Sequence, residues 1–421
     1  MTAPSTPPPG TPTAGAPPNP LLDPAVQADP YPLYAMLRAN NPVFRLPIPV
    51  ETGAGVFALT RHADVEAVLR DPEHRFSVQR RKGDLFRLYR DQLPAALVDG
   101  PGGAQSMLMQ DPPAHTRLRG LVSKAFTPRR VAELAPRVEA LVAELVDEAL
   151  AKGETDWIHD LAEPLPAIVI AELLGVPPED HRTFRGWSSR LIDSVPSFGL
   201  GGREDVESSV ATILDYLRRQ IALRRADPTD DLLSGLIEAQ EEQDALSDDE
   251  LVSTAFLLLL AGHETTTNLI GNGLLALLRH PDAWAHLRGH PERVDHAVEE
   301  LLRFDSPVQA TVRIPIEDVS IGGHAIGKGA MVVCGIGAAN RDPEVHPDPD
   351  RLDLARDPIR HLSFGFGTHF CLGASLARLE GRAVFRALAD RVKSIERVGD
   401  ALRYRANPIL RGLKSLPVRL H

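Results

Sequence analysis

The strongest constraint on the fold is one long apolar segment near the middle of the chain. Ser247-Asp248-Asp249-Glu250 is a capping box, in which a serine and a glutamate three residues later satisfy each other's free N–H groups at a helix start. The helix that it opens is predicted to run to about Arg279, and its middle is apolar on almost every side. Such a helix must be buried through a core. The other elements are therefore expected to surround it.

The segments on both sides of this helix indicate a mainly α fold with small antiparallel β-sheets. Asp111-Pro112 and Thr127-Pro128 each place a capping side chain before a proline, which predicts two helix starts. Further helices are predicted over residues 168–174, 184–192, 206–223, 281–287, 291–304 and 372–388. Residues 43–46, 55–59, 312–333 and the segment after 395 are predicted to form short strands. Residues 76–110 lack periodicity, so we predict a long loop there, of the kind that is usually functional or disordered.

Composition excludes several classes of protein. The chain has 421 residues and a net charge of 46 − 57 = −11, so a nucleic-acid-binding function is not expected. The most apolar run, residues 255–261, is far shorter than the ~20 residues needed to cross a bilayer. Two cysteines cannot build a disulfide framework, which fits a reducing cytoplasm. Residues 1–20 hold eight of the 37 prolines and show no secretory signal; we predict a disordered tail there and a single domain over residues 21–421.

The most informative local motif surrounds one cysteine. In the run Phe364-Gly365-Phe366-Gly367-Thr368-His369-Phe370-Cys371-Leu372-Gly373, three glycines crowd a single thiol just before a predicted helix. Glycines permit turns that leave N–H groups pointing at one sulfur. A thiolate at a helix N-terminus also gains from the helix dipole, so the pKa of Cys371 is expected to fall. A lone cysteine is more often a small buried residue, but the glycine pattern favours a thiolate metal ligand.

A second motif, Ala261-Gly262-His263-Glu264-Thr265-Thr266, interrupts the long helix with residues that form helices poorly. The Thr265 hydroxyl is predicted to donate to the carbonyl of Ala261, four residues back, which would bend the helix. Ala261 and Gly262 would leave a shallow groove for a flat cofactor or small molecule. Glu264 and Thr265 would lie beside it as a proton-delivering pair. The alternative is a locally strained helix with a solvated acid.

A third motif, Glu300-Leu301-Leu302-Arg303, places an acid and an arginine on one helix face. Taken alone, such a pair is ordinary surface decoration worth a few tenths of a kcal/mol.

Together, in this order, the three motifs resemble the cytochrome P-450 family, and specifically its soluble bacterial class. The haem loop of the family, Phe-x-x-Gly-x-x-x-Cys-x-Gly, is matched by Phe364, Gly367, Cys371 and Gly373. The family's Ala-Gly-x-Asp/Glu-Thr-Thr and Glu-x-x-Arg motifs fall on residues 261–266 and on the Glu300/Arg303 pair. The resemblance extends from about residue 29 to the C-terminus. One departure is Leu352, where the family usually has Phe.

The resemblance implies a triangular helical prism with haem b between the long helix and the cysteine loop. Cys371 would be the axial ligand of the iron, and Glu264 and Thr265 would relay protons. The remaining cofactor contacts that it implies are His115, Arg119, Ala261, Arg313, Phe364, Gly365, His369 and Gly373, with His115, Arg119, Arg313 and His369 serving the haem propionates. Glu300 and Arg303 would form a buried pair that organises the fold, shared with Arg341.

The resemblance also implies the surroundings of the reaction. Substrate contacts are expected from Leu257, Ala261, Val308, Gln309, Thr311 and Ile409, mainly apolar positions that argue for a hydrophobic substrate. No flavin or nicotinamide motif is present, so NAD(P)H electrons would arrive through a separate ferredoxin-type partner. Arg117, Arg360, Arg378 and Arg382 are predicted to form a basic patch for it. We expect a cytoplasmic monomer.

Two enzymatic functions and one non-enzymatic function are consistent with these features. The first is a monooxygenase that hydroxylates or epoxidises a terpenoid, polyketide, steroid or fatty-acid-like molecule. The second is a peroxide-driven haem peroxygenase, and the third a haem-fold scaffold that binds without turnover. Peroxide-using relatives replace the acid–threonine pair, whereas Glu264 and Thr265 are present here. The family gives Cys334 no role, and we expect it to be a buried apolar residue.

Overall fold

The computed structural model describes residues 23–48, 55–90, 95–100, 103, 105–183, 186–187, 203–243, 246–405 and 407–421. The predicted tail over residues 1–20 and most of the helix predicted over residues 184–192 lie outside these ranges. No helix in the described ranges combines the length and the apolar character that a membrane crossing requires.

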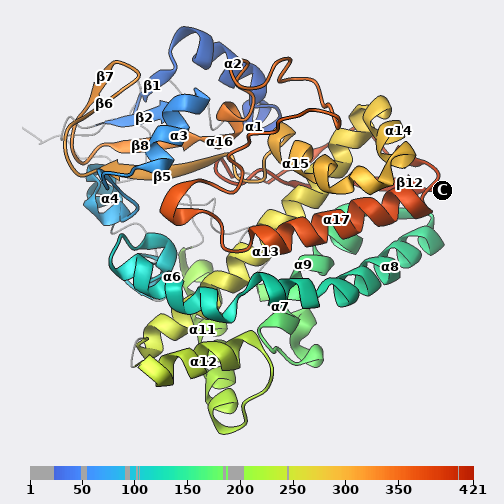
Figure 1. Cartoon of the computed structure of the whole chain (residues 1–421), viewed down its shortest axis with the longest axis horizontal. Helices are drawn as coiled ribbons and strands as arrows, with labels where there is room; N and C mark the ends of the chain where they lie inside the picture. The colour runs from blue at the N-terminus through green and yellow to red at the C-terminus, as the bar shows by residue number, and fades with distance from the viewer. Residues whose placement is uncertain are drawn as a thin grey trace, which may run out of the picture.

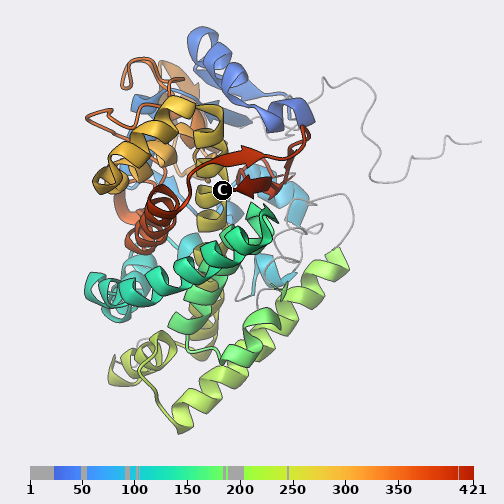
Figure 2. The ribbon, with the colours of Figure 1, turned by 90° about the vertical axis from the view of Figure 1, so that its right-hand side faces the viewer.

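The predicted central helix is confirmed as α13 (Asp248–Arg279), whose 32 residues make it the longest described helix. Ser247 and Glu250 form both halves of the capping box at its start. The helix packs against α9 (Pro164–Leu173), α11 (Arg203–Ala226), α15 (Val294–Phe304) and α17 (Ala374–Arg391). Figures 1 and 2 show α13, in yellow, running through the middle of the molecule. Most of its side chains are buried, as an apolar helix requires.

Shorter α-helices lie along the rest of the described chain. They are α1 (Pro24–Ala28), α2 (Tyr31–Asn40), α3 (His62–Arg70), α4 (Asp84–Tyr89), α5 (Ala95–Val98), α6 (Ala114–Ala125), α7 (Pro128–Glu133), α8 (Ala135–Lys152), α12 (Leu232–Gln243), α14 (Pro281–Gly289) and α16 (Ile336–Ala339). The Thr127 side chain caps α7 by accepting a hydrogen bond from the Arg130 N–H, as predicted.

The strands form one larger sheet and three small ones. The larger sheet has the order β1 (Val43–Leu46), β2 (Val56–Leu59), β8 (Met331–Gly335), β5 (Ala310–Pro315), β3 (Phe76–Ser77). Its β2–β8 pair is parallel and its other pairs are antiparallel. The small sheets are β4 (Glu154–Asp156) with β12 (Pro417–Leu420) and β9 (Ile395–Arg397), β6 (Val319–Ile321) with β7 (His324–Ile326), and β10 (Arg403–Tyr404) with β11 (Leu413–Ser415). The larger sheet lies at the upper left of Figure 1.

Two local predictions before α6 are wrong. Residues 76–110 do not form one long loop: their described part contains β3, α4, α5 and the 3-10 turns Arg80–Lys82 and Met107–Met109. These pieces are too short to produce a periodic sequence pattern. Asp111 does not cap α6, whose N-cap is Pro113. Its carboxylate instead accepts hydrogen bonds from the Ser77 hydroxyl, the Val78 N–H and Lys82.

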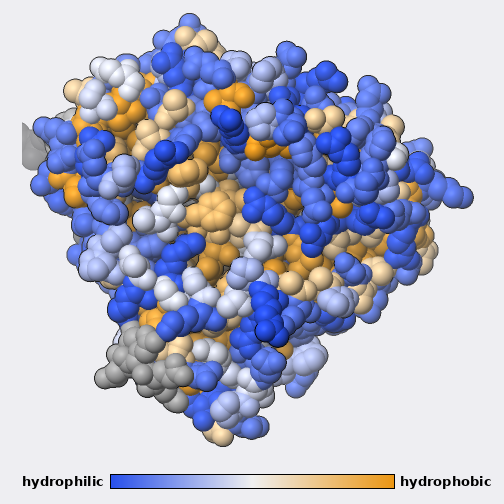
Figure 3. All heavy atoms as spheres, viewed as in Figure 1, coloured by the Kyte–Doolittle hydropathy of each residue, from blue (hydrophilic) through white to orange (hydrophobic). Residues whose placement is uncertain are grey.

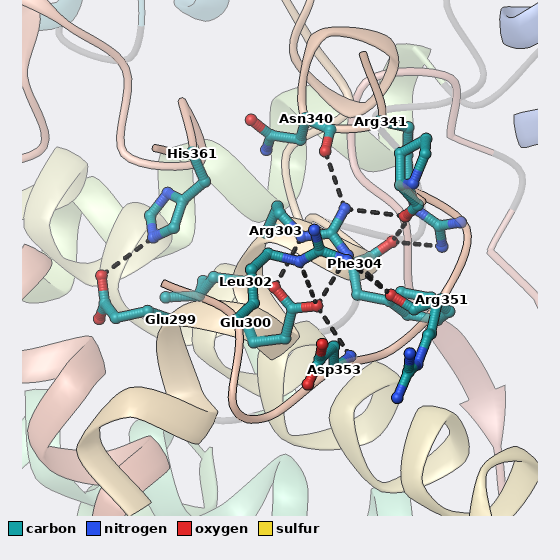
Figure 4. A network of polar contacts seen from close by, with 12 residues as sticks. Glu299, Glu300, Leu302, Arg303, Phe304, Asn340, Arg341, Arg351, Asp353 and His361 are labelled. Carbon is teal, nitrogen blue, oxygen red and sulfur yellow. Dashed lines mark hydrogen bonds and ion pairs between the residues drawn. The ribbon is translucent and has the colours of Figure 1, made fainter. Parts of the chain in front are cut away.

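The Glu300–Arg303 pair is buried in the core (Figure 4). The Arg303 guanidinium donates to both Glu300 carboxylate oxygens, at 2.7 and 2.8 Å, and to the carbonyls of Asn340, Pro349 and Arg351. Arg341 does not share this pair, contrary to prediction, because it donates to the Phe304 carbonyl and to Asp350. The arginine that shares Glu300 is Arg356, at 3.1 Å. The network therefore joins α15 to the segment that precedes the cysteine loop.

Candidate active site

The cysteine loop has the backbone that its glycines predict. Gly365 and Gly367 have φ angles of 71° and 70°, in the left-handed region that glycine favours. A Cβ atom on Gly367 would also lie 2.6 Å from the Leu69 carbonyl oxygen, so only glycine fits there. The Cys371 N–H donates to the Phe364 carbonyl at 2.8 Å, which closes the loop, and α17 begins three residues later. The Cys371 side chain keeps an exposed face.

The surroundings of Cys371 shift the pKa of its thiol in opposite directions. Burial among neighbouring atoms raises the pKa of Cys371, and the Gly373 N–H, Arg119 and Arg378 oppose this only in part. The predicted fall of this pKa is therefore wrong for the protein alone, because the loss of hydration outweighs the helix terminus and the nearby cations. A cation bound directly at the sulfur would reverse the balance, since a coordinating thiol is deprotonated.

Four cationic or donor side chains gather near the cysteine loop. The rings of His115 and His369 lie 4.0 Å apart, and the Nδ1 atom of His115 is buried with no hydrogen-bond partner. Burial, together with His115, Arg313 and Arg119, lowers the pKa of His369 to about 3, although Asp111 opposes the shift. Within the described ranges, neither Arg119 nor Arg313 forms an ion pair. All four residues predicted for the propionates are thus brought together. Asp111 is the nearby acid, and its charge acts to raise the pKa of His115 and of His369.

One stripe in the buried middle of α13 stays accessible. Ala261 is exposed, and Leu257 and Thr265, one turn before and after it, are half-buried. These residues lie four apart and therefore share one stripe. The predicted hydrogen bond is confirmed, since the Thr265 hydroxyl donates to the Ala261 carbonyl at 2.9 Å. Gly262 instead packs against Ile170 of α9. A flat ligand could lie against this stripe, where the smallest side chain is at the centre.

Glu264 is buried rather than solvated. Only 4% of the residue is exposed, and its Oε1 atom lies 3.4 Å from the Asn268 amide and 3.9 Å from the Nε atom of Arg405. The alternative of a solvated acid on a strained helix is therefore wrong. Sequence reasoning missed Arg405, because its proximity depends on how the segment after β10 returns to α13.

The residues predicted to contact a substrate fall into two groups. Leu257, Val308, Thr311 and Ile409 are half-buried and Ala261 is exposed, so all five keep accessible surface. Val308 also pairs with Leu410 in an isolated bridge, which brings it beside Ile409. Gln309 is different: it is 3% exposed, and its amide donates to the Ser306 carbonyl at 2.8 Å and to the Tyr31 hydroxyl at 3.4 Å. The prediction for Gln309 is wrong because this side chain points into the fold.

The predicted basic patch is largely neutralised. Arg117 pairs with Glu250, Arg378 with Glu299 and Arg382 with Asp295, whereas Arg360 is exposed. Figure 3 shows an apolar hollow, bordered by hydrophilic side chains, near the middle of the face where Figure 1 has the loop before α17. Phe370, next to Cys371, is 40% exposed.

The residues present fit a haem group. Cys371 offers a sulfur ligand, the His115/Arg119/Arg313/His369 group offers charge and donors to two carboxylates, and the exposed stripe of α13 offers a surface for the ring plane. The most direct sign of this fit is the Nδ1 atom of His115, which is buried and has no hydrogen-bond partner, because a buried polar atom normally has one.

Comparisons with known proteins agree with this geometry. A sequence model of the family described as "Cytochrome P-450" matches residues 203–389. The chain is 44% identical over 414 residues to a vitamin D(3) 25-hydroxylase of Pseudonocardia autotrophica, covering 97% of the chain and 98% of that protein. It is 43% identical over 400 residues to the cytochrome P-450 monooxygenase PikC of Streptomyces venezuelae, covering 93% and 91%. The solved structure of PksS, a polyketide synthase cytochrome P-450 of Bacillus subtilis, superposes with a TM-score of 0.85 at 39% identity, covering 95% and 99%.

Proposed function

The chain belongs to the cytochrome P-450 family and is a haem-dependent monooxygenase, and from this premise we propose that it hydroxylates or epoxidises a hydrophobic small molecule of secondary metabolism. When bound, haem supplies the activation of dioxygen and the transfer of one oxygen atom. The single observation that carries the proposal for this chain is the grouping of an accessible thiol with four buried or half-buried donors that lack an anionic ion-pair partner in the described residues.

Each residue of the group has a distinct task in this proposal. Cys371 holds the iron through its sulfur atom, and the backbone of Phe364, Gly365 and Gly373 holds the loop in shape around it. His115, Arg119, Arg313 and His369 bind the two propionates. Burial is the main cause of the lowered pKa of His369, and the charges of His115, Arg313 and Arg119 lower it further. Two carboxylates held among these side chains would offset that second contribution.

Thr265 and Glu264 are proposed to hold and move protons at the α13 stripe. The Thr265 hydroxyl donates its hydrogen to the Ala261 carbonyl, so the lone pairs of its oxygen are left to accept a hydrogen bond from a neighbouring proton donor. Glu264 is adjacent in sequence and is buried, which keeps a titratable group close to the site without opening it to bulk water. General acid–base groups of this kind contribute roughly 10²–10⁴-fold in rate.

The substrate is proposed to be large and apolar. Leu257, Ala261, Val308 and Ile409 present accessible apolar surface. Among similar proteins, one is named a vitamin D(3) 25-hydroxylase, one a 6-deoxyerythronolide B hydroxylase, and one solved structure contains myristic acid. These names support a steroid-like, polyketide or fatty-acid-like substrate for this chain over a small polar one.

The electron donor, assembly state and location complete the proposal. A ferredoxin-type partner is expected to deliver electrons from NAD(P)H at the face that carries the cysteine loop. Residues 21–421 are proposed to act as a single domain, monomeric and cytoplasmic, which is supported by relatives that align along 97% of the chain and by two free cysteines. Sedimentation analysis tests the monomer, and reconstitution with and without a ferredoxin tests the donor.

The decisive experiment compares two threonines of α13. Thr265→Ala should still bind haem and substrate, but electrons should appear in hydrogen peroxide or water instead of product. Thr267→Ala is the matched control, because Thr267 makes the same bond to a carbonyl four residues back, at 3.1 Å to His263, but is buried. Equal coupling in wild type and Thr265→Ala would refute the proton role. Product formed with peroxide alone at the rate of the reductase-driven reaction would favour the peroxygenase.

A further inference from the structure

Two ion pairs join α15 and α17, one helical turn apart. In the inner pair, Arg378 donates from Nε and Nη2 to the two carboxylate oxygens of Glu299, at 2.7 and 2.8 Å. In the outer pair, Arg382 makes one contact with Asp295, at 3.0 Å. The inner pair lies nearer the end of α17 that follows Cys371. The chain therefore contains two similar charge pairs at different separations from the cysteine loop.

The inner pair is held more firmly than an ordinary surface pair. His361 lies on Glu299, with Nε2 at 3.0 Å from Oε2, and the Ser363 N–H donates to the Nδ1 atom of His361. Since Nδ1 accepts, Nε2 carries the hydrogen and donates to the carboxylate. Burial opposes ionisation, but the bonds from Arg378 and His361 prevail and lower the pKa of Glu299 to about 2. Figure 4 shows Glu299 and His361 facing each other, apart from the Glu300–Arg303 network.

The guanidinium of Arg378 acts on the cysteine loop. It lies 4.4 Å from the centre of the Phe364 ring, and the carbonyl of Phe364 accepts the hydrogen bond from the Cys371 N–H. Arg378 therefore lies against the residue whose carbonyl closes the loop on Cys371. The Arg378 and Glu299 side chains are 37% and 28% exposed, so water screens their charges only in part. Arg382 and Asp295 are more exposed, at 42% and 69%.

We propose that the Glu299–Arg378 pair sets the reduction potential of the iron held by Cys371, with Arg378 raising it and Glu299 lowering it. The proposal rests on the proposed role of Cys371 as the iron ligand. In the step concerned, one electron from the external donor reduces iron(III) to iron(II), no bond is broken, and the charge of the centre falls by one. A nearby cation stabilises the more negative state and a nearby carboxylate destabilises it.

The test is the midpoint potential of the holoenzyme, measured by titration with a chemical reductant and redox dyes. Arg378→Gln should lower the potential and Glu299→Gln should raise it, each by up to about tenfold in the reduction equilibrium, or about 59 mV for one electron. Glu299→Gln/Arg378→Gln should lie between the single variants, and Arg378→Lys should stay near wild type because the charge remains. Arg382→Gln and Asp295→Asn are the matched controls and should leave the potential unchanged.

The two partners should therefore shift the potential in opposite directions, which a purely structural role would not produce. Shifts of the same sign in both single variants, no shift in either, or equal shifts in the outer pair would each overturn the proposal. The carbon-monoxide spectrum of the reduced protein separates this outcome from failure of the proposed function. A wild-type protein without the thiolate band would refute Cys371 as the ligand, whereas a normal band with unmoved potentials would refute the charge pair alone.

Discussion

Arg303→Met tests whether the buried ion pair holds the segment that leads to the cysteine loop. The substitution keeps an apolar side chain of similar length but removes two bonds to Glu300 and three to the carbonyls of residues 340, 349 and 351. Breaking a buried pair by removing one partner costs about 3–5 kcal/mol. Glu300 would keep the Asp353 N–H and Arg356, so its charge would remain compensated. We therefore expect Arg303→Met to lower the free energy of unfolding by about 3 kcal/mol, the lower limit of that range.

Removing the acid of the pair should destabilise the fold more than removing the arginine. Glu300→Leu would leave two buried guanidinium groups, Arg303 and Arg356, facing each other without the carboxylate between them. We expect the free energy of unfolding to fall by more than in Arg303→Met, by about 5 kcal/mol or more.

The assay is urea denaturation followed by circular dichroism, with haem retention measured in parallel. With a slope of about 3 kcal/mol per molar urea, a loss of about 3 kcal/mol lowers the midpoint by about 1 M. Arg293→Ala is the control, because Arg293 lies at the start of α15 and is exposed. A midpoint for Arg303→Met within error of Arg293→Ala, or a smaller loss for Glu300→Leu than for Arg303→Met, would refute this reasoning.

Three further predictions follow from single residues. Cys371→His should lose the red-shifted carbon-monoxide band of the reduced protein, whereas Cys334→Ser should keep it; burial raises the pKa of Cys334 to about 12, so that thiol should also resist alkylation in the folded protein. Burial, followed by the charges of Arg303 and His62, lowers the pKa of His346 to about 3, so the unfolded chain binds more protons between pH 6.5 and pH 3. Stability should fall by up to about 5 kcal/mol as the pH drops through this window, and His346→Gln should flatten that acid limb in denaturation curves. Leu257→Phe should change the substrate dissociation constant measured in spin-state titrations, because Leu257 has accessible surface. Gln309→Leu should lower the melting temperature and leave that constant near wild type, because the Gln309 side chain is buried and hydrogen-bonded within the fold. A Gln309→Leu protein with altered substrate binding and an unchanged melting temperature would contradict this placement of the side chain.

Local chemistry made the main elements of this protein predictable from its sequence. The capping box at Ser247 and the apolar periodicity after it specify α13 over nearly its whole length, because both depend on contacts within a few residues. The same holds for the bond from Thr265 to Ala261 and for the turns at Gly365 and Gly367, where only glycine tolerates the backbone. The four donors near the cysteine loop, by contrast, were expected only from the resemblance to the cytochrome P-450 family.

Only the tertiary structure decided which polar groups meet across the chain. Arg356, and not Arg341, shares Glu300, because an irregular segment with no periodicity determines which guanidinium reaches the carboxylate. Gln309 turns inward because Tyr31, 278 residues away in sequence, offers its hydroxyl. The Cys371 thiol has a raised pKa because desolvation depends on the atoms packed around it, whereas the helix start that would lower it is visible in the sequence. Burial and long-range partners are properties of packing, and a local pattern does not encode them.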